Sequence, residues 1–118
     1  MENHKLVLPE HLNQYGYLFG GNLLKWVDEY AWIAATLDYP GCNFVTIGLD
    51  KVDFKKSVKQ GAILTFISEK TREGRTSVQY AVNVFQSTGN KNSRELIFST
   101  HVTYVRIDES GRKVTIRK

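Results

Sequence analysis

The sequence predicts an α+β fold in which one long helix packs against an antiparallel β-sheet. Apolar residues follow helical spacing over residues 21–37 and alternate with a period of two after Gly41. The alternating segments follow one another without a helix between them, which excludes a βαβ architecture. The chain has 118 residues and contains no repeat or linker-like segment, so we expect a single domain over residues 1–118.

The first predicted elements are a short strand near Lys5–Leu8 and the helix. Gly20 and Gly21 surround the helix start, and Asn22 is a residue type that commonly caps one. The apolar stripe of the helix consists mainly of small residues, which allow a helix to lie close to a sheet. The sheet is the only large apolar surface available to this stripe, and we expect it to curve around the helix.

Four long strands are expected after the helix. Each is rich in β-branched and aromatic residues, and they span residues 43–54, 61–72, 75–87 and 94–107. Gly74 marks a tight turn between the second and third, and residues 87–92 (STGNKN) form a looser turn before the fourth. The basic tail, residues 112–118, is predicted either to add a short strand or to stay mobile.

The charge distribution indicates an anionic partner. Residues 1–59 hold 6 Lys and Arg against 7 Asp and Glu, whereas residues 60–118 hold 10 against 5. A basic half suits a phosphorylated small molecule, a nucleic acid or a membrane surface. Zinc-finger spacing, an RNA-binding aromatic motif and a basic zipper are all missing from the sequence, which makes nucleic acid the weakest of these candidates.

Other features of the composition favour a cytoplasmic protein. The only cysteine is Cys42, so no intrachain disulfide is expected. No apolar run approaches the roughly 18 residues that span a membrane. The first residues, MENHKLVLPEH, lack the basic and apolar regions of a signal peptide.

Asp28 is the unusual residue of the predicted helix, because it falls on the apolar stripe near one border. Three interpretations follow from its position. The carboxylate reaches solvent from the border, or it is buried and bonded to backbone N–H groups, or it lines a cleft as a base or nucleophile. Helical position alone does not decide between them.

The glycines before the helix favour the cleft. Gly16, Gly20 and Gly21 allow a ligand or another backbone to approach closely. They also leave the first amides of the helix open, and these amides suit an oxygen that gains negative charge during acyl transfer. The alternative is that the glycines only shape a tight entry turn.

These residues resemble the signature of the hot-dog-fold acyl-CoA thioesterases, most closely the cytosolic acyl-CoA hydrolases that include the YciA-type bacterial enzymes. The resemblance begins with residues 13–21 (NQYGYLFGG), followed by residues 26–29 (WVDE). It continues in the same order and spacing within residues 9–108, through Val45-Thr46, Val52-Asp53-Phe54, Gly61 and Gly74-Arg75-Thr76-Ser77.

The resemblance implies both a fold and an activity. The fold is a long central helix wrapped by a curved antiparallel sheet. The activity is hydrolysis of acyl-CoA to a free carboxylic acid and CoA. The resemblance also implies a homodimer with a continuous sheet and composite active sites at its interface, assembled further into a hexamer or tetramer. Coenzyme A belongs to the substrate and the product, and neither another cofactor nor a metal is implied.

The resemblance also assigns catalytic roles. Asp28 corresponds to the catalytic carboxylate, which activates a water or attacks the thioester directly. Asn13 is expected to assist the Asp of the neighbouring subunit. An amide of Gly20 or Gly21 would contact the oxyanion, and Thr46 matches a position near the reaction centre, where the alternative is an ordinary strand threonine.

Two segments are expected to bind CoA. Arg75, Thr76 and Ser77 match a CoA-associated segment, and an Arg fork with hydroxyls suits phosphate oxygens. The basic loop of Lys55, Lys56 and Lys59 is a further candidate for a CoA phosphate. A polar hairpin turn and a solvated run of lysines are the respective alternatives.

Two other functions stay open at this point. One is a non-catalytic acyl-CoA-binding hot-dog module. The other is a nucleic-acid-binding protein that uses the basic half. The intact pair of Asn13 and Asp28 argues against the first. The predicted partners are therefore acyl-CoA and further copies of the chain, with neither nucleic acid nor a membrane.

Overall fold

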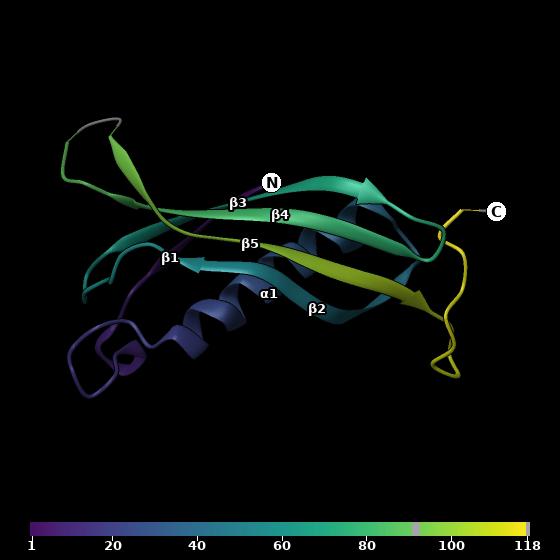
Figure 1. Cartoon of the computed structure of the whole chain (residues 1–118), viewed down its shortest axis with the longest axis horizontal. Coiled ribbons are helices and arrows are strands. Elements are labelled where there is room, and N and C mark those ends of the chain that lie inside the picture. Colours follow the sequence, from purple (N-terminus) through teal and green to yellow (C-terminus); the bar gives the residue numbers. More distant parts are fainter. Residues whose placement is uncertain (91–92, 118) are drawn as a thin grey trace.

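The structure, a computed structural model, describes residues 1–90 and 93–117. In chain order its elements are β1 (Glu2–Leu6), the 3-10 turn η1 (Pro9–His11), α1 (Gly20–Asp38), β2 (Asn43–Phe54), β3 (Ile63–Glu73), β4 (Ser77–Ser87) and β5 (Arg94–Ile107). The strands form one antiparallel sheet in the order β1-β3-β4-β5-β2, with α1 along one face (Figure 1). The predicted α+β class is confirmed, and the arrangement is that of the hot-dog fold.

The predicted strands agree closely with those found. β2 and β5 have the predicted bounds, and β3 and β4 each begin slightly later than predicted. The N-terminal strand is Glu2–Leu6 instead of Lys5–Leu8, because the chain leaves the sheet after Val7 and turns at η1. The predicted turn over residues 87–92 and the tail each extend beyond the described residues, at Lys91, Asn92 and Lys118.

The core lies between α1 and the curved sheet. Val27, Ala31 and Ala35 are fully buried on the helix. The side chains opposite come from all the long strands and include Phe44, Phe66, Val82, Val102 and Tyr104. Small residues on the helix therefore meet large residues on the sheet, as the sequence predicted.

The helix begins differently from the prediction. Phe19 is the N-cap, with an extended backbone and no side-chain cap, so the prediction that Asn22 caps the helix is wrong. The Asn22 side chain instead donates to the His11 carbonyl at 3.0 Å. This bond ties the first turn of α1 to η1, which precedes the Asn13–Phe19 loop.

β2 is an edge strand with an irregular course. Its register against β5 shifts between Thr46 and Gly48 and again between Asp50 and Asp53, and Lys51 has a φ of 52°. Apolar side chains are exposed on this strand and on the neighbouring face of α1: Val45, Ile47, Val52, Phe54, Trp32, Ile33 and Leu37. The molecule therefore presents an uncovered apolar surface beside a free strand edge.

The described part of the tail packs against the β3–β4 turn. The Ile116 amide donates to the Arg75 carbonyl at 2.9 Å, and the Ile116 side chain is buried. Arg117 pairs with Glu73 at 2.6 Å. Residues 112–117 form a single bridge, between Ile107 and Lys113, and no strand.

Candidate active site

Asp28 is half-buried on α1, directly after the fully buried Val27. Its Oδ1 atom accepts hydrogen bonds from Thr46 Oγ1 at 2.8 Å and from the Tyr104 hydroxyl at 3.0 Å. These partners are side-chain hydroxyls and not the backbone N–H groups that one sequence interpretation required. Within residues 1–90 and 93–117, neither a hydrogen bond nor an ion pair reaches Oδ2.

Thr46 reaches Asp28 from the edge strand β2. The resemblance placed this residue near the reaction centre, and in the structure its hydroxyl donates to the Asp28 carboxylate. Thr46 is paired with Tyr104 of β5 across the sheet, directly before the first register shift of β2. The sheet therefore brings both hydroxyl donors to the same carboxylate oxygen.

Tyr104 is a site residue that sequence reasoning missed. It is fully buried on β5, and its hydroxyl lies 2.8 Å from the Asp28 carbonyl oxygen and 3.0 Å from Oδ1. Burial raises the pKa of this hydroxyl far above its usual range, and the charge of Asp28 raises it further. The group therefore remains a protonated donor. A buried Tyr needs a partner for its hydroxyl, which was the available signal in the sequence.

A pocket of about 310 Å³ opens beside Asp28. Trp32, one helical turn further on, and Ile33 supply its apolar wall, and Thr46 and Glu29 complete the lining. The Trp32 indole is fixed by a hydrogen bond of 3.1 Å from Nε1 to the Phe44 carbonyl. The site thus combines the Asp28 carboxylate, with Glu29 beside it, and an apolar recess.

Asn13 organises its own loop in this chain. Its Oδ1 atom accepts from the amides of Tyr15 and Tyr17 at 2.9 and 3.1 Å. This bonding supports the tight loop around Gly16, which has a φ of 85°. Asn13 forms no hydrogen bond with Asp28 and does not line its pocket. One chain therefore does not bring these two predicted residues together.

Gly20 and Gly21 form the first turn of α1, and in the described part of the chain their amides have no hydrogen-bond acceptor. A Cβ at Gly21 would lie 3.0 Å from the Phe19 ring. At a rise of about 1.5 Å per residue, Gly21 and Asp28 are roughly 10 Å apart along the helix. The open amides and the carboxylate of one chain are thus too far apart to act on one carbonyl group.

The basic loop lies beside the helix start. Lys55 and Lys56 line a pocket of about 320 Å³ together with Gly20. Lys55 is paired with Asp53 at 2.6 Å, and Lys56 with Glu95 at 2.9 Å. Lys59 is exposed and forms no ion pair among the described residues.

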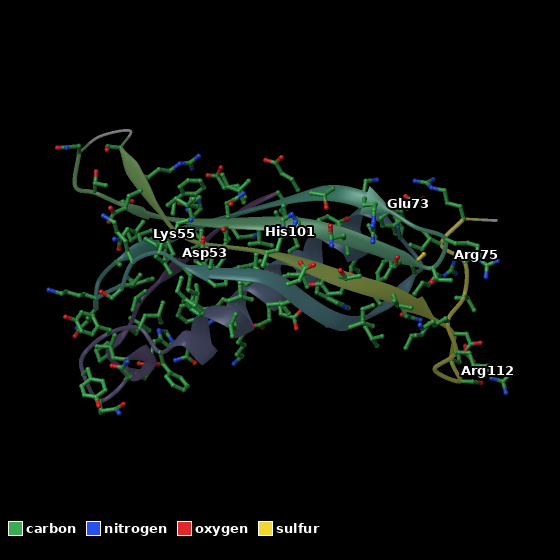
Figure 2. The ribbon with its side chains drawn as sticks, in the orientation of Figure 1. Asp53, Lys55, Glu73, Arg75, His101 and Arg112 are labelled. Atoms are coloured by element: carbon green, nitrogen blue, oxygen red, sulfur yellow. The ribbon has the colours of Figure 1, made fainter. Side chains whose placement is uncertain are left out.

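Arg75, Thr76 and Ser77 lie at the other end of the molecule. Figure 2 shows Lys55 and Arg75 near opposite ends of the sheet, in a protein whose longest extent is 47 Å. The carbonyls of Arg75 and Thr76 accept from Ile116 and Arg106, and the Arg75 side chain is exposed. The two predicted CoA-binding segments are therefore separated within one chain.

Two further findings concern the described chain as a whole. No group of three or more His, Cys, Asp or Glu side chains in the described ranges is arranged to hold a metal ion. In the same ranges, no helix is both long and apolar enough to cross a membrane.

A long helix wrapped by an antiparallel sheet is the arrangement of the hot-dog proteins, and here a helical carboxylate lies beside an apolar pocket. The family model of the Thioesterase superfamily matches residues 15–93. The chain belongs to this superfamily.

Individual relatives agree with this assignment. An uncharacterized acyl-CoA thioester hydrolase of Bacillus subtilis is 31% identical over 110 residues, which cover 93% of this chain and 63% of that protein. An acetyl-coenzyme A thioesterase of Mus musculus is 32% identical over 81% of this chain but only 18% of its own length. The chain thus spans less than two thirds of these relatives.

Solved structures extend the comparison. An acyl-CoA hydrolase from Staphylococcus aureus, determined in complex with butyryl-CoA, CoA and CoA disulfide, has a TM-score of 0.89 and 29% identity, covering 98% of this chain and 70% of its own. A hexameric acyl-CoA thioesterase has a TM-score of 0.87 and 34% identity, covering 98% of this chain and 73% of its own.

Proposed function

We propose that this chain hydrolyses acyl-CoA thioesters, with Asp28 as the catalytic carboxylate. The observation that carries the proposal is the position of Asp28, which is held through one oxygen beside an apolar pocket. An acyl chain fits such a recess, and the free oxygen faces no competing partner in the described chain. The names of the relatives support the same reaction.

The Staphylococcus aureus enzyme supports the choice of residues. Structures exist of its variants in which an Asp, a Thr or an Asn is replaced by Ala. In that enzyme the Asn precedes the Asp by the same number of positions by which Asn13 precedes Asp28. The spacing from Asp28 to Thr46 is one position longer than the spacing from the Asp to the Thr in that enzyme. We therefore infer that these residues form the corresponding set.

The proposed reaction needs one base and stabilisation of an oxyanion. In the first form, Oδ2 of Asp28 accepts a proton from water as the water oxygen bonds to the thioester carbon. Backbone amides stabilise the resulting oxyanion, the C–S bond breaks, and the proton passes to the departing thiolate. In the second form, Oδ2 itself bonds to the thioester carbon, the C–S bond breaks and the CoA thiolate leaves. Water then hydrolyses the resulting anhydride, which releases the carboxylic acid and restores the Asp28 carboxylate.

A second copy of the chain completes the proposed site. Asn13 and the amides of Gly20 and Gly21 do not reach Asp28 within one chain, as described above. Pairing of two β2 edges in antiparallel orientation would place the helix start of one copy near the middle of the other helix. The exposed apolar residues of β2 and α1 would be covered by this contact.

The same antiparallel pairing accounts for the separated CoA-binding segments. It would bring the end that carries Lys55 in one copy toward the end that carries Arg75 in the other. One CoA would then be held by residues of both chains. We also propose that such dimers assemble further, as the hexameric relative does, and that the protein is cytoplasmic.

The test is hydrolysis of short-, medium- and long-chain acyl-CoAs, followed with a thiol reagent. We expect turnover by the wild-type protein and a decrease in kcat of about 10²- to 10⁴-fold for Asp28→Ala. Glu29→Ala, the neighbouring carboxylate without a hydrogen bond to Thr46 or Tyr104, serves as the comparison and should lose far less activity.

The outcomes separate the two functions that remain. Tight binding of acyl-CoA without turnover would support the non-catalytic binding module and reject the hydrolase. Wild-type turnover by Asp28→Ala would reject the assigned carboxylate while leaving the activity in place.

A further inference from the structure

The Tyr104 hydroxyl has two acceptors on the same residue of α1. It lies 2.8 Å from the Asp28 carbonyl oxygen and 3.0 Å from Oδ1 of the carboxylate. A phenol has one proton to donate, so the two oxygens share it. The contact therefore links the side chain of Asp28 to its own backbone through a third group.

The position of this hydroxyl is set by rigid packing. Tyr104 is fully buried, and its ring makes edge contacts with Tyr80 at 6.4 Å and with Phe44 at 6.5 Å between centroids. A side chain enclosed in this way keeps one rotamer. Thr46, the other donor to Oδ1, is exposed on the edge strand and lacks this enclosure.

We propose that Tyr104 is a positioning residue that fixes the rotamer of Asp28 and reserves Oδ2 for the reaction. This proposal rests on the proposed function. Thr46 and Tyr104 together occupy Oδ1, so the carboxylate presents the other oxygen to the pocket. Reactions of this kind depend on holding the catalytic atom in one orientation.

Two hydroxyl groups hold the carboxylate from the side of the sheet. In the described ranges no Lys, Arg or His pairs with Asp28, and the only other carboxylate lining its pocket is Glu29 of the same helix. β5 contributes Tyr104 and β2 contributes Thr46. The orientation of Asp28 within this chain therefore depends on these two donors.

The experiment compares Tyr104→Phe with Tyr80→Phe. Each variant removes one hydroxyl from a buried ring of the same core, and the Tyr80 hydroxyl bonds to Asp38 at 2.6 Å and not to Asp28. We expect Tyr104→Phe to lower kcat about tenfold, which is the scale of one hydrogen bond to a charged group. KM for acyl-CoA should stay near the wild-type value, because Tyr104 does not line the pocket.

Tyr80→Phe should keep both kcat and KM of the wild-type protein. Thermal unfolding of the two variants checks that both are folded at the assay temperature. If Tyr104→Phe matches Tyr80→Phe in kcat and KM, Tyr104 is structural only and the positioning proposal is rejected.

A second comparison separates this proposal from the proposed function. In an Asp28→Ala background, Tyr104→Phe should cause no further loss, because the group on which it acts is gone. Equal additional losses in both backgrounds would reject positioning through Asp28. If the wild-type protein hydrolyses no acyl-CoA, the proposed function fails, which is a different result from an active enzyme insensitive to Tyr104→Phe.

Discussion

At the residue scale, the carboxylate of Asp28 is held by two hydroxyl groups and not by a cation. An Arg partner would bind both carboxylate oxygens in a fork and would compete with any substrate. Hydroxyl donors on Oδ1 fix the side chain and leave the other oxygen accessible. This arrangement orients the carboxylate without covering the oxygen that the proposed reaction uses.

Trp32 is expected to set how long an acyl chain the pocket accepts. It lines the recess next to Asp28 and is fixed by its bond to the Phe44 carbonyl. Trp32→Ala should enlarge the pocket and raise the ratio of kcat/KM for long over short acyl-CoA by about tenfold, the scale of a few methylene groups. A panel of acyl-CoA lengths measures this ratio.

The comparison variant is Leu37→Ala, which is exposed on the same helix but does not line the pocket. Its chain-length preference should equal that of the wild-type protein. An unchanged ratio in Trp32→Ala would show that another surface limits the acyl chain.

The sequence indicated Asp28 and Thr46 but not Tyr104. Helical spacing placed Asp28 at the border of the stripe, and the family pattern supplied its role. Which strand residue would face it depends on how the sheet curves and on the register between β2 and β5. The curvature and the register depend on contacts between distant parts of the chain, so they could not be predicted from the local pattern of one sequence.

At the element scale, long strands were predicted well and helix or strand ends less well. β4 alternates between buried and less buried side chains over residues 77–84, so packing and local preference agree. Asn22 is a residue type that favours the N-cap position of a helix, yet its side chain donates to the His11 carbonyl instead. This contact with the preceding 3-10 turn overrode the local preference.

Glu73 joins three elements at the end of the molecule opposite Lys55 (Figure 2). It binds Arg117 of the tail and the hydroxyl of Tyr39, which follows α1. The Arg117 bond, and after it the Tyr39 bond, lowers the pKa of the Glu73 carboxyl to about 2 from 4.5. The carboxylate thus stays charged in the folded protein at pH values where the unfolded chain would bind a proton.

This shift predicts a pH-dependent effect of Glu73→Gln on stability. Because the folded pKa is the lower one, the stabilisation is complete above about pH 4.5 and is lost as the pH falls toward about 2. The variant should therefore melt below the wild-type protein at pH 7, and the difference should close at low pH. Thermal unfolding across this range measures it.

Glu69→Gln is the control, since Glu69 lies exposed on the same strand and forms no ion pair in the described chain. Its melting temperature should follow the wild-type value at every pH. A constant difference between Glu73→Gln and the wild type from pH 7 to pH 2 would contradict the role assigned to the charge.

At the scale of the whole molecule, the uncovered surface is the dominant feature. One sheet edge and the adjacent face of the helix expose large apolar side chains, among them Ile47 at 57% and Leu37 at 61%. The catalytic groups assigned to one reaction are also spread over distances that a single chain does not bridge. Both observations have the same explanation in the proposed dimer.

Ile47→Glu should weaken this dimer. A charge on the apolar edge strand would have to be buried without a partner, which is costly. We expect light scattering after gel filtration to give the monomer mass, and acyl-CoA turnover to fall with it because each site is composite. The matched change Leu6→Glu, on the other edge strand β1, should keep the dimer and its activity.

A fully active monomer would overturn the composite site, even if Asp28 proved essential. A dimeric Ile47→Glu protein would instead indicate that the two chains pair through a different surface.

The irregular course of β2 has a consequence for which strands can join its edge. A straight foreign strand cannot follow an edge with two register shifts and a left-handed backbone at Lys51. Asp50, Lys51 and Asp53 add charges along the same stretch, which further discourages indiscriminate pairing. A strand with the same irregularities in reverse order fits best, and another copy of this chain carries one. The deviations from ideal strand geometry would therefore disfavour aggregation with unrelated strands and still allow the proposed pairing with a second copy of the chain.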